Sequence, residues 1–218
     1  MNRAILVGSE NVSNLILMWE NMAPKIVIIL GHPNKKSFGG ALANAYAESA
    51  RKCGCAVSEL HIASMQFDAT PASMPPAELE ADLVASRAAI AEAQHIVLVY
   101  PTWMGTMPAR MKGFFERVFT DNFAFRVRPD SLMPEQLLKG RSADVLATMD
   151  TPPLLYRFVM GAPGHKMVRR SILGVSGIKP IKIFSFGSLR SSSDAKRARW
   201  LERTARRASA VSDRLQSS

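Results

Sequence analysis

The stretch VLVYPTWMGTMPARMKGFFERVF, Val97 to Phe119, decides the fold of this chain. It continues an apolar run that starts at His95 and shows no alternation as far as Tyr100, which is typical of a central strand buried on both faces. Pro101 ends the strand because it cannot donate to a ladder, and Pro108 begins a helix at its favoured first position. The apolar residues of that helix fall at helical spacing: Met111, Phe114, Phe115, Val118 and Phe119.

Between this strand and this helix lies a loop that is too apolar for ordinary solvent exposure. It contains Thr102, Trp103, Met104 and Gly105. Open α/β sheets bind their ligands at the carboxyl ends of their strands, which is where this loop falls. An aromatic loop that also contains glycine therefore suits a flat, partly apolar ring.

The rest of the chain repeats the same alternation of strand and helix. Further strands are predicted over residues 25–30, 56–62, 142–149 and 179–186. Helices are predicted over residues 41–52, 77–93 and 158–175, the last one interrupted near Gly161, and from Ser193 onward, where the serine can cap the helix. This pattern predicts one α/β domain with a parallel sheet and helices on both faces. We expect the domain to span residues 24–218 and residues 1–23 to form an extension outside its core.

Composition narrows the class of protein. The formal net charge of +10 favours anionic ligands such as nucleotides, and nucleic acid is the rival ligand, although no nucleic-acid-binding motif is present. No apolar run reaches the ~18 residues of a membrane span. The only two cysteines, Cys53 and Cys55, indicate a reducing, cytoplasmic location, with a redox-active pair as the alternative. We see no metal-binding pattern and no catalytic triad.

The first predicted loop, GHPNKKSFGG over residues 31–40, has the features of a phosphate site. Small side chains and backbone N–H groups precede a helix, and the N-terminus of a helix binds anions. Lys35 and Lys36 add positive charge. The dinucleotide fingerprint GxGxxG and the P-loop GxxxxGK[ST] are both absent, which disfavours a Rossmann dehydrogenase and an ATPase.

Two of these segments resemble a known family. The patterns YPxWxGxMPAxxKGFFxRVF and HPNxxSFxxAL are similar to the flavin-binding segments of the flavodoxin-like NAD(P)H:quinone oxidoreductases, and the resemblance runs from about Lys25 to about Leu189. It implies a flavodoxin-like three-layer sandwich with strand order 2-1-3-4-5. It also implies an enzyme that passes hydride from NAD(P)H through flavin N5 to a quinone or similar small acceptor.

The resemblance also implies the residues of the site. The implied flavin contacts are His32, Ser37, Phe38, Gly39, Pro101, Thr102, Trp103, Met104, Gly105, Met149, Asp150 and Thr151. Tyr156 and His165 are the candidates for a catalytic pair beside the nicotinamide, and the alternative for His165 is a surface residue at the end of a helix. Phe125 and Val127 match positions that line the substrate pocket across the interface of a homodimer.

Some alternatives stay open at this stage. FMN and FAD both fit, and the short loop over residues 63–76 slightly favours FMN. A flavoprotein with a regulatory role, such as the ancillary subunit of a potassium-efflux system, and a one-electron carrier remain as other functions. The basic residues of the last helix indicate a solvated face, an NADPH 2′-phosphate site or an anionic membrane surface.

Overall fold

The computed structural model describes residues 23–70 and 78–217. The predicted extension over residues 1–23 lies almost entirely outside the described residues. The strands are β1 (Lys25–Leu30), β2 (Ala56–His61), β3 (His95–Pro101), β4 (Phe125–Arg126), β5 (Glu135–Gln136), β6 (Ser142–Thr148) and β7 (Ile181–Phe186). The helices are α2 (Phe38–Lys52), α3 (Ala81–Glu92), α4 (Ala109–Val118), α5 (Pro153–Phe158), α6 (Pro163–Lys166) and α7 (Asp194–Gln216), with the 3-10 turn η1 (Ile62–Ser64) and the π-helical segment η2 (Met167–Gly174).

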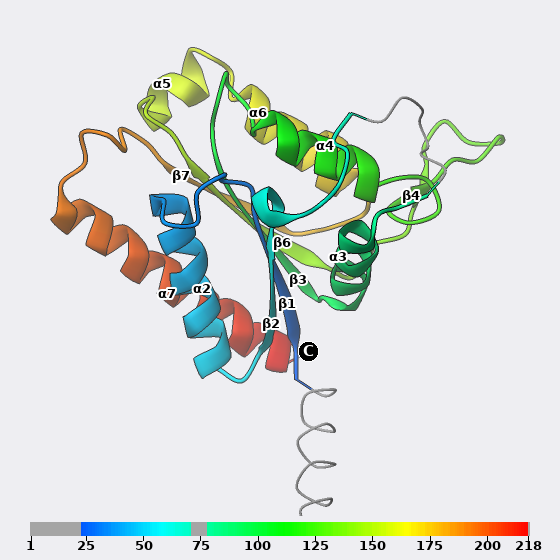
Figure 1. Ribbon diagram of the computed structural model, residues 1–218, viewed down its shortest axis with the longest axis horizontal. Helices are drawn as coiled ribbons and strands as arrows, with labels where there is room; N and C mark the ends of the chain where they lie inside the picture. Colours follow the sequence, from blue (N-terminus) through cyan, green and yellow to red (C-terminus); the bar gives the residue numbers. More distant parts are fainter. Residues whose placement is uncertain (1–22, 71–77, 218) are drawn as a thin grey trace, which may run out of the picture.

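The main sheet is five-stranded and parallel, in the order β2-β1-β3-β6-β7. This order confirms the predicted order 2-1-3-4-5, because β4 and β5 form a separate antiparallel ribbon. Figure 1 shows α2 and α7 on one face of the sheet, and α3, α4 and α6 on the other. The molecule is therefore the three-layer sandwich that the sequence predicts.

The central strands are continuous apolar runs because both of their faces are covered. Every residue of β3 and β6 is buried. Along β3, Val97 and Val99 join the core under α2 and α7, whereas Ile96 and Leu98 join the core under the opposite helices. Side chains of a strand alternate between faces, so one apolar strand supplies both cores.

A buried polar network fastens α7 to the base of the sheet. Asp144 of β6 accepts hydrogen bonds from Arg207 of α7, at 2.7 and 2.9 Å, and from the hydroxyl of Tyr46 at 3.0 Å. His95 lies 3.1 Å from the same hydroxyl. Burial alone would raise the pKa of Asp144, but its hydrogen bonds to His95 and Arg207 lower that pKa to about 2. Asp144 is thus a buried carboxylate that is fully partnered.

The predicted boundaries were wrong in two places near the ligand loops. The helix predicted over residues 41–52 begins earlier, at Phe38, because the side chain of Ser37 caps it. The helix predicted over residues 158–175 is interrupted near Gly161, as expected, but α5 before the break begins earlier, at Pro153, and the part after the break is α6 followed by the π-helical η2. The break falls where Gly161 and Ala162 both have positive φ, a conformation that no α-helix contains.

Candidate functional site

The loop after β1 is held by short-range hydrogen bonds that expose the start of α2. The ring nitrogen Nδ1 of His32 accepts from the backbone N–H of Asn34 at 2.9 Å, and the side chain of Asn34 accepts from the N–H of Lys36 at 2.8 Å. Ser37 Oγ accepts from the N–H of Gly40 at 3.1 Å. The first-turn N–H groups of Phe38 and Gly39 have no partner within the helix, so they are available to an anion.

Sequence reasoning missed one residue of this loop. A Cβ atom on Gly40 would lie 1.8 Å from the carbonyl oxygen of Lys35, so only glycine fits. A Cβ atom on Gly39 would make ordinary contacts, the nearest at 3.6 Å from Ser37 Oγ. The adjacent pair of glycines was the available signal, but the sequence could not tell which of them the turn requires.

Phe38 is placed differently from the other predicted contacts of this loop. Its ring lies 5.8 Å from that of Trp200 and 6.5 Å from that of Phe186, in an aromatic cluster between α2, β7 and α7. Its side chain therefore anchors the start of α2 to the core. Its contribution to a phosphate site is its backbone N–H.

The loop after β3 contains a tight turn. Trp103 and Thr106 exchange two backbone hydrogen bonds, of 2.8 and 3.0 Å. The two residues between them have positive φ, 48° at Met104 and 82° at Gly105. This pairing is that of a type I′ turn, which favours glycine at its second central position and is strained for methionine at its first. The turn projects Met104 into solvent and leaves Trp103 half exposed.

The loops after β1 and β3 meet at this turn. The rings of His32 and Trp103 lie 6.1 Å apart, edge to face. Pro101 is the last residue of β3, and Thr102 continues the ladder by donating its backbone N–H to Thr148. The hydroxyl oxygen of Thr102 is buried without a hydrogen-bond partner. This hydroxyl is therefore free to form a hydrogen bond with a polar ligand atom.

The loop after β6 supplies less of the site than its sequence suggested. The side chain of Met149 is buried in the core, so it contributes backbone groups only. Asp150 is exposed and binds Arg190, accepting from its backbone N–H at 3.0 Å. A cavity of about 220 Å³ opens here, lined by Asp150, Ser188, Arg190 and Ser191. The carbonyl oxygen of Thr151 faces Gly187. A Cβ atom on Gly187 would lie 2.7 Å from this oxygen, which is too close for any side chain there.

The structure brings Tyr156 and His165, the two candidates from the sequence, close together. Their ring centroids lie 4.9 Å apart at 74°. The hydroxyl of Tyr156 donates to the carbonyl oxygen of Gly105 at 2.8 Å and accepts from the N–H of Gly164 at 3.0 Å. Burial raises the pKa of Tyr156 and lowers the pKa of His165, and Arg169 lowers the latter further. Both side chains are therefore neutral near pH 7.

The two members of this pair differ in what they can offer a ligand. The hydroxyl of Tyr156 is occupied by backbone groups, and its side chain is fully buried. The Nε2 atom of His165 is buried without a hydrogen-bond partner. His165 thus carries the unused hydrogen-bonding group, and Tyr156 holds the turn beside it.

The predicted substrate-pocket residues lie away from this site within one chain. Phe125 lines a cavity of about 180 Å³ between α4 and η2, and Val127 is exposed. The Trp103 turn precedes the start of α4, whereas Phe125 follows its end. A ten-residue helix is about 15 Å long, so the two regions are separated by about that distance. Within one chain, Phe125 and Trp103 therefore do not line one site.

The residues present fit a phosphorylated flat ring. The start of α2 offers N–H groups and two lysines to a phosphate, and the Trp103 turn offers an aromatic side chain and a glycine backbone to a ring. Thr102 and His165 contribute unpartnered buried polar atoms. Across the described residues, no group of three His, Cys, Asp or Glu side chains could hold a metal ion. Fold and site together define a flavodoxin-like protein.

Comparison with known proteins gives the family. Residues 24–210 match the family model described as a flavodoxin-like fold. Because this match covers most of the chain, the chain belongs to the family with the flavodoxin-like fold, in agreement with the resemblance of its motifs.

Two relatives by sequence are informative. The chain is 25% identical over 194 residues to an uncharacterized NAD(P)H oxidoreductase of Haemophilus influenzae, covering 84% of this chain and 94% of that protein. It is 27% identical over 141 residues to the ribosyldihydronicotinamide dehydrogenase (quinone) of Mus musculus, covering 55% of this chain and 60% of that enzyme. The chain thus spans nearly all of the bacterial relative but less than two thirds of the mouse enzyme.

Solved structures show the same fold. Smu.1420 from Streptococcus mutans is 28% identical, with a TM-score of 0.75 over 85% of this chain and 98% of that one. The NAD(P)H:quinone oxidoreductase from Methanothermobacter marburgensis is 22% identical, with a TM-score of 0.70 over 87% of this chain and 97% of that one. An FMN-dependent NADH-azoreductase from Bacillus anthracis, in complex with FMN, is 16% identical, with a TM-score of 0.67 over 88% and 99%. The last two likenesses concern the fold alone.

No helix among the described residues is long and apolar enough to cross a membrane.

Proposed function

We propose that this chain is an FMN-dependent NAD(P)H oxidoreductase that reduces quinones or similar small acceptors. The observation that carries the proposal is the meeting of the two loops at His32 and Trp103, one loop with an anion-binding helix start and the other with an aromatic turn. The relatives named above as NAD(P)H and quinone oxidoreductases support the reaction class. FMN supplies the chemistry, since a flavin exchanges hydride with a nicotinamide and then with an acceptor.

The proposed phosphate site is the start of α2. The N–H groups of Phe38 and Gly39 face the phosphate, and the hydroxyl of Ser37 keeps the first turn in shape by capping it. Lys35 and Lys36 attract the dianion. His32 contributes its position beside Trp103, at the boundary between phosphate and ring.

The proposed ring site runs from Pro101 to Gly105. Trp103 and Met104 cover the edges of the ring, while backbone N–H groups of the turn bind its polar edge. Donors fixed beside the pyrimidine edge stabilise the negative charge that develops there on reduction, because they need no reorientation. The backbone at Met149, Asp150 and Thr151 closes the other side.

In this proposal His165 contacts the nicotinamide or the acceptor, and Tyr156 positions the turn that contacts the ring. The neutral imidazole of His165 has one unpartnered nitrogen, Nε2. Because burial lowers the pKa of His165, it donates or accepts a hydrogen bond without adding a charge near pH 7.

We also propose a homodimer in the cytoplasm. Phe125 and Val127 lie beyond the far end of α4 from the Trp103 turn, so the site of one chain would be completed by these two residues of the other. Exposed apolar side chains also lie on α5 and the segment after it, on the side of the Trp103 turn, since Tyr156 of α5 binds the carbonyl of Gly105: Leu154, Leu155, Phe158, Val159 and Met160. Large exposed apolar patches commonly mark interaction surfaces.

The test is reconstitution followed by the two half-reactions. The purified protein is loaded with FMN or with FAD, reduced with one equivalent of NADPH or NADH without oxygen, and then mixed with a soluble quinone. The proposal predicts that FMN binds more tightly than FAD and that one equivalent of quinone reoxidises it. Reduction by NAD(P)H without reoxidation by any quinone would contradict the acceptor, and would favour a carrier or regulatory flavoprotein.

A further inference from the structure

His61 lies outside the proposed flavin site but contacts its phosphate loop. It is the last residue of the edge strand β2. Its Nε2 atom lies 2.8 Å from the carbonyl oxygen of His32. A carbonyl oxygen can only accept, so Nε2 carries the proton and donates to His32. A side chain of the edge strand therefore binds the backbone of the loop.

The other hydrogen bonds of this loop are internal or involve the sheet backbone. The N–H of Gly31 donates to the carbonyl of Val99 at 2.8 Å, where the loop leaves β1. The remaining bonds join His32, Asn34, Lys36 and Ser37 to one another. Among the side-chain hydrogen bonds of the described residues, the bond from His61 is the one that joins residues 31–37 to an element other than α2, into which the loop runs.

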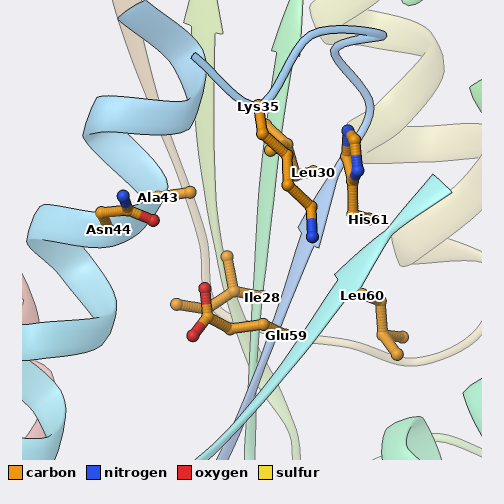
Figure 2. Close-up of a pocket in the computed structure, with 8 residues that line it drawn as sticks. All are labelled: Ile28, Leu30, Lys35, Ala43, Asn44, Glu59, Leu60 and His61. Atoms are coloured by element: carbon orange, nitrogen blue, oxygen red, sulfur yellow. The ribbon is translucent and has the colours of Figure 1, made fainter. Parts of the chain in front are cut away.

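The space beneath the loop makes this bond more important. A cavity of about 170 Å³ lies between α2 and β2, with an apolar floor that includes Ile28 and Leu30. Figure 2 shows Lys35 extending from the loop into this cavity and His61 standing beside it. Because the loop spans a cavity, close packing from below does not fix its conformation there.

The second ring nitrogen of His61 indicates the same role. Its Nδ1 atom is buried without a hydrogen-bond partner. A buried polar atom without a partner is unfavourable, so a purely structural residue at this position would do better with an apolar side chain. The contact that a histidine gains here is the bond to the carbonyl of His32.

We infer that His61 is a positioning residue for the phosphate-binding loop, and this inference rests on the proposed function. By holding the carbonyl of His32, it fixes the peptide that starts the loop and hence the direction of the N–H groups at the start of α2. His61 touches neither phosphate nor ring. Its effect is therefore on the phosphate half of the ligand and not on the ring half.

The test compares FMN with riboflavin, which has the same ring but no phosphate. Dissociation constants are measured by quenching of flavin fluorescence for the wild type, His61→Ala and His61→Gln. Ser64→Ala is the matched control, since its hydroxyl bonds the carbonyl of His61 at 2.9 Å but does not reach the loop.

His61→Ala should weaken FMN binding about tenfold, the size of one lost hydrogen bond, and change riboflavin binding less than about twofold. His61→Gln should restore most of the FMN affinity, because its amide N–H lies near the position of histidine Nε2. Ser64→Ala should bind both ligands as the wild type does. Equal losses for FMN and riboflavin, or no loss for either, would overturn the inference.

A second measurement separates this inference from the proposed function. Hydrogen exchange of the amides of residues 31–40 is followed in the protein without flavin, for the wild type and His61→Ala. Exchange in the variant should be about tenfold faster, since the loop has lost its hydrogen bond from His61. If the wild type binds no flavin, the proposed function fails while this comparison still decides the role of His61. Unchanged exchange would overturn that role.

Discussion

The hydroxyl group of Tyr156 donates a hydrogen bond to the carbonyl oxygen of Gly105 at 2.8 Å, across 51 positions of the sequence. The backbone N–H of Gly164 donates both to this hydroxyl, at 3.0 Å, and to the carbonyl of Gly105, at 3.1 Å. These bonds tie the turn that carries Trp103 to the segment that carries His165. The turn needs such support because its two central residues have positive φ.

Replacing Tyr156 with Phe should loosen this turn. The change removes two hydrogen bonds and leaves the carbonyl of Gly105 with one partner, so we expect FMN to bind about tenfold more weakly. Fluorescence titration measures the affinity. Tyr100→Phe is the matched control, because the hydroxyl of Tyr100 is equally buried but has no partner. If both variants bind FMN as the wild type does, the tie between Tyr156 and Gly105 has no part in cofactor binding.

Gly105→Val should reduce flavin retention while the fold persists. A β-branched residue is strongly disfavoured at φ 82°, so the turn must rearrange where the ring is proposed to lie. Combining it with Trp103→Ala should remove the remaining contact and most of the bound flavin. Flavin absorbance per chain after purification gives the result.

Gly140→Val provides the control for backbone strain. Gly140 also has φ 82°, and a side chain there meets nothing within 4 Å. Both valine variants should lose roughly 1–2 kcal/mol of unfolding free energy, but only the change at position 105 should lower flavin content. Full flavin occupancy in Gly105→Val would place the ring elsewhere.

Two serine caps allow stability to be separated from phosphate binding. Ser37 caps α2 and Ser193 caps α7, each by accepting from an N–H three residues on. Replacing either with Ala should cost about 1 kcal/mol of unfolding free energy. Only Ser37→Ala should also weaken FMN binding. Urea unfolding and FMN titration, run on both variants, measure the two effects, and equal FMN affinities would argue against a phosphate at the start of α2.

Stability should fall as the pH falls, because of the network around Asp144. Burial lowers the pKa of His95 in the folded chain. Below about pH 6.5 the unfolded chain therefore binds more protons than the folded chain, and the free energy of unfolding falls. The pKa of Asp144 is lowered to about 2. Its contribution is complete above about pH 4 and is lost as the pH falls from there through about 2.

Urea unfolding at about pH 7 and about pH 4 measures the part of this dependence that comes from His95. His95→Gln should make the unfolding free energy depend less on pH below about pH 6.5. Asp144→Asn should instead cost about 3 kcal/mol at neutral pH, because Arg207 loses its buried partner. A wild type that is equally stable at both pH values would show that the network does not control the acid response.

The sequence predicted the sheet well because its strands are short apolar runs between turns. β1 has the predicted bounds, and β3 and β6 differ from prediction by one residue at an end. The region after β6 was predicted less well, since no helix was predicted between this strand and residue 158. Pro153 instead occupies the first turn of α5, where its missing N–H has no consequence.

The site was predicted in its parts but not in its connections. Tyr156 and His165 were named as candidates, but the bend at Gly161 and Ala162 that folds one ring onto the other was not foreseen. The contact from His61 to His32 joins the end of β2 to the loop after β1, and it forms because the two strands pair in the sheet. Such contacts depend on strand order and rotamers, which no local pattern in the sequence records.

The most direct test of the central claim is the visible spectrum of the purified protein, before and after NADPH is added without oxygen. The account predicts flavin bands that bleach with NADPH or NADH and return when a quinone is added. It also predicts that FMN is the cofactor released on denaturation. A protein that shows no flavin bands, even after incubation with FMN, would contradict the account.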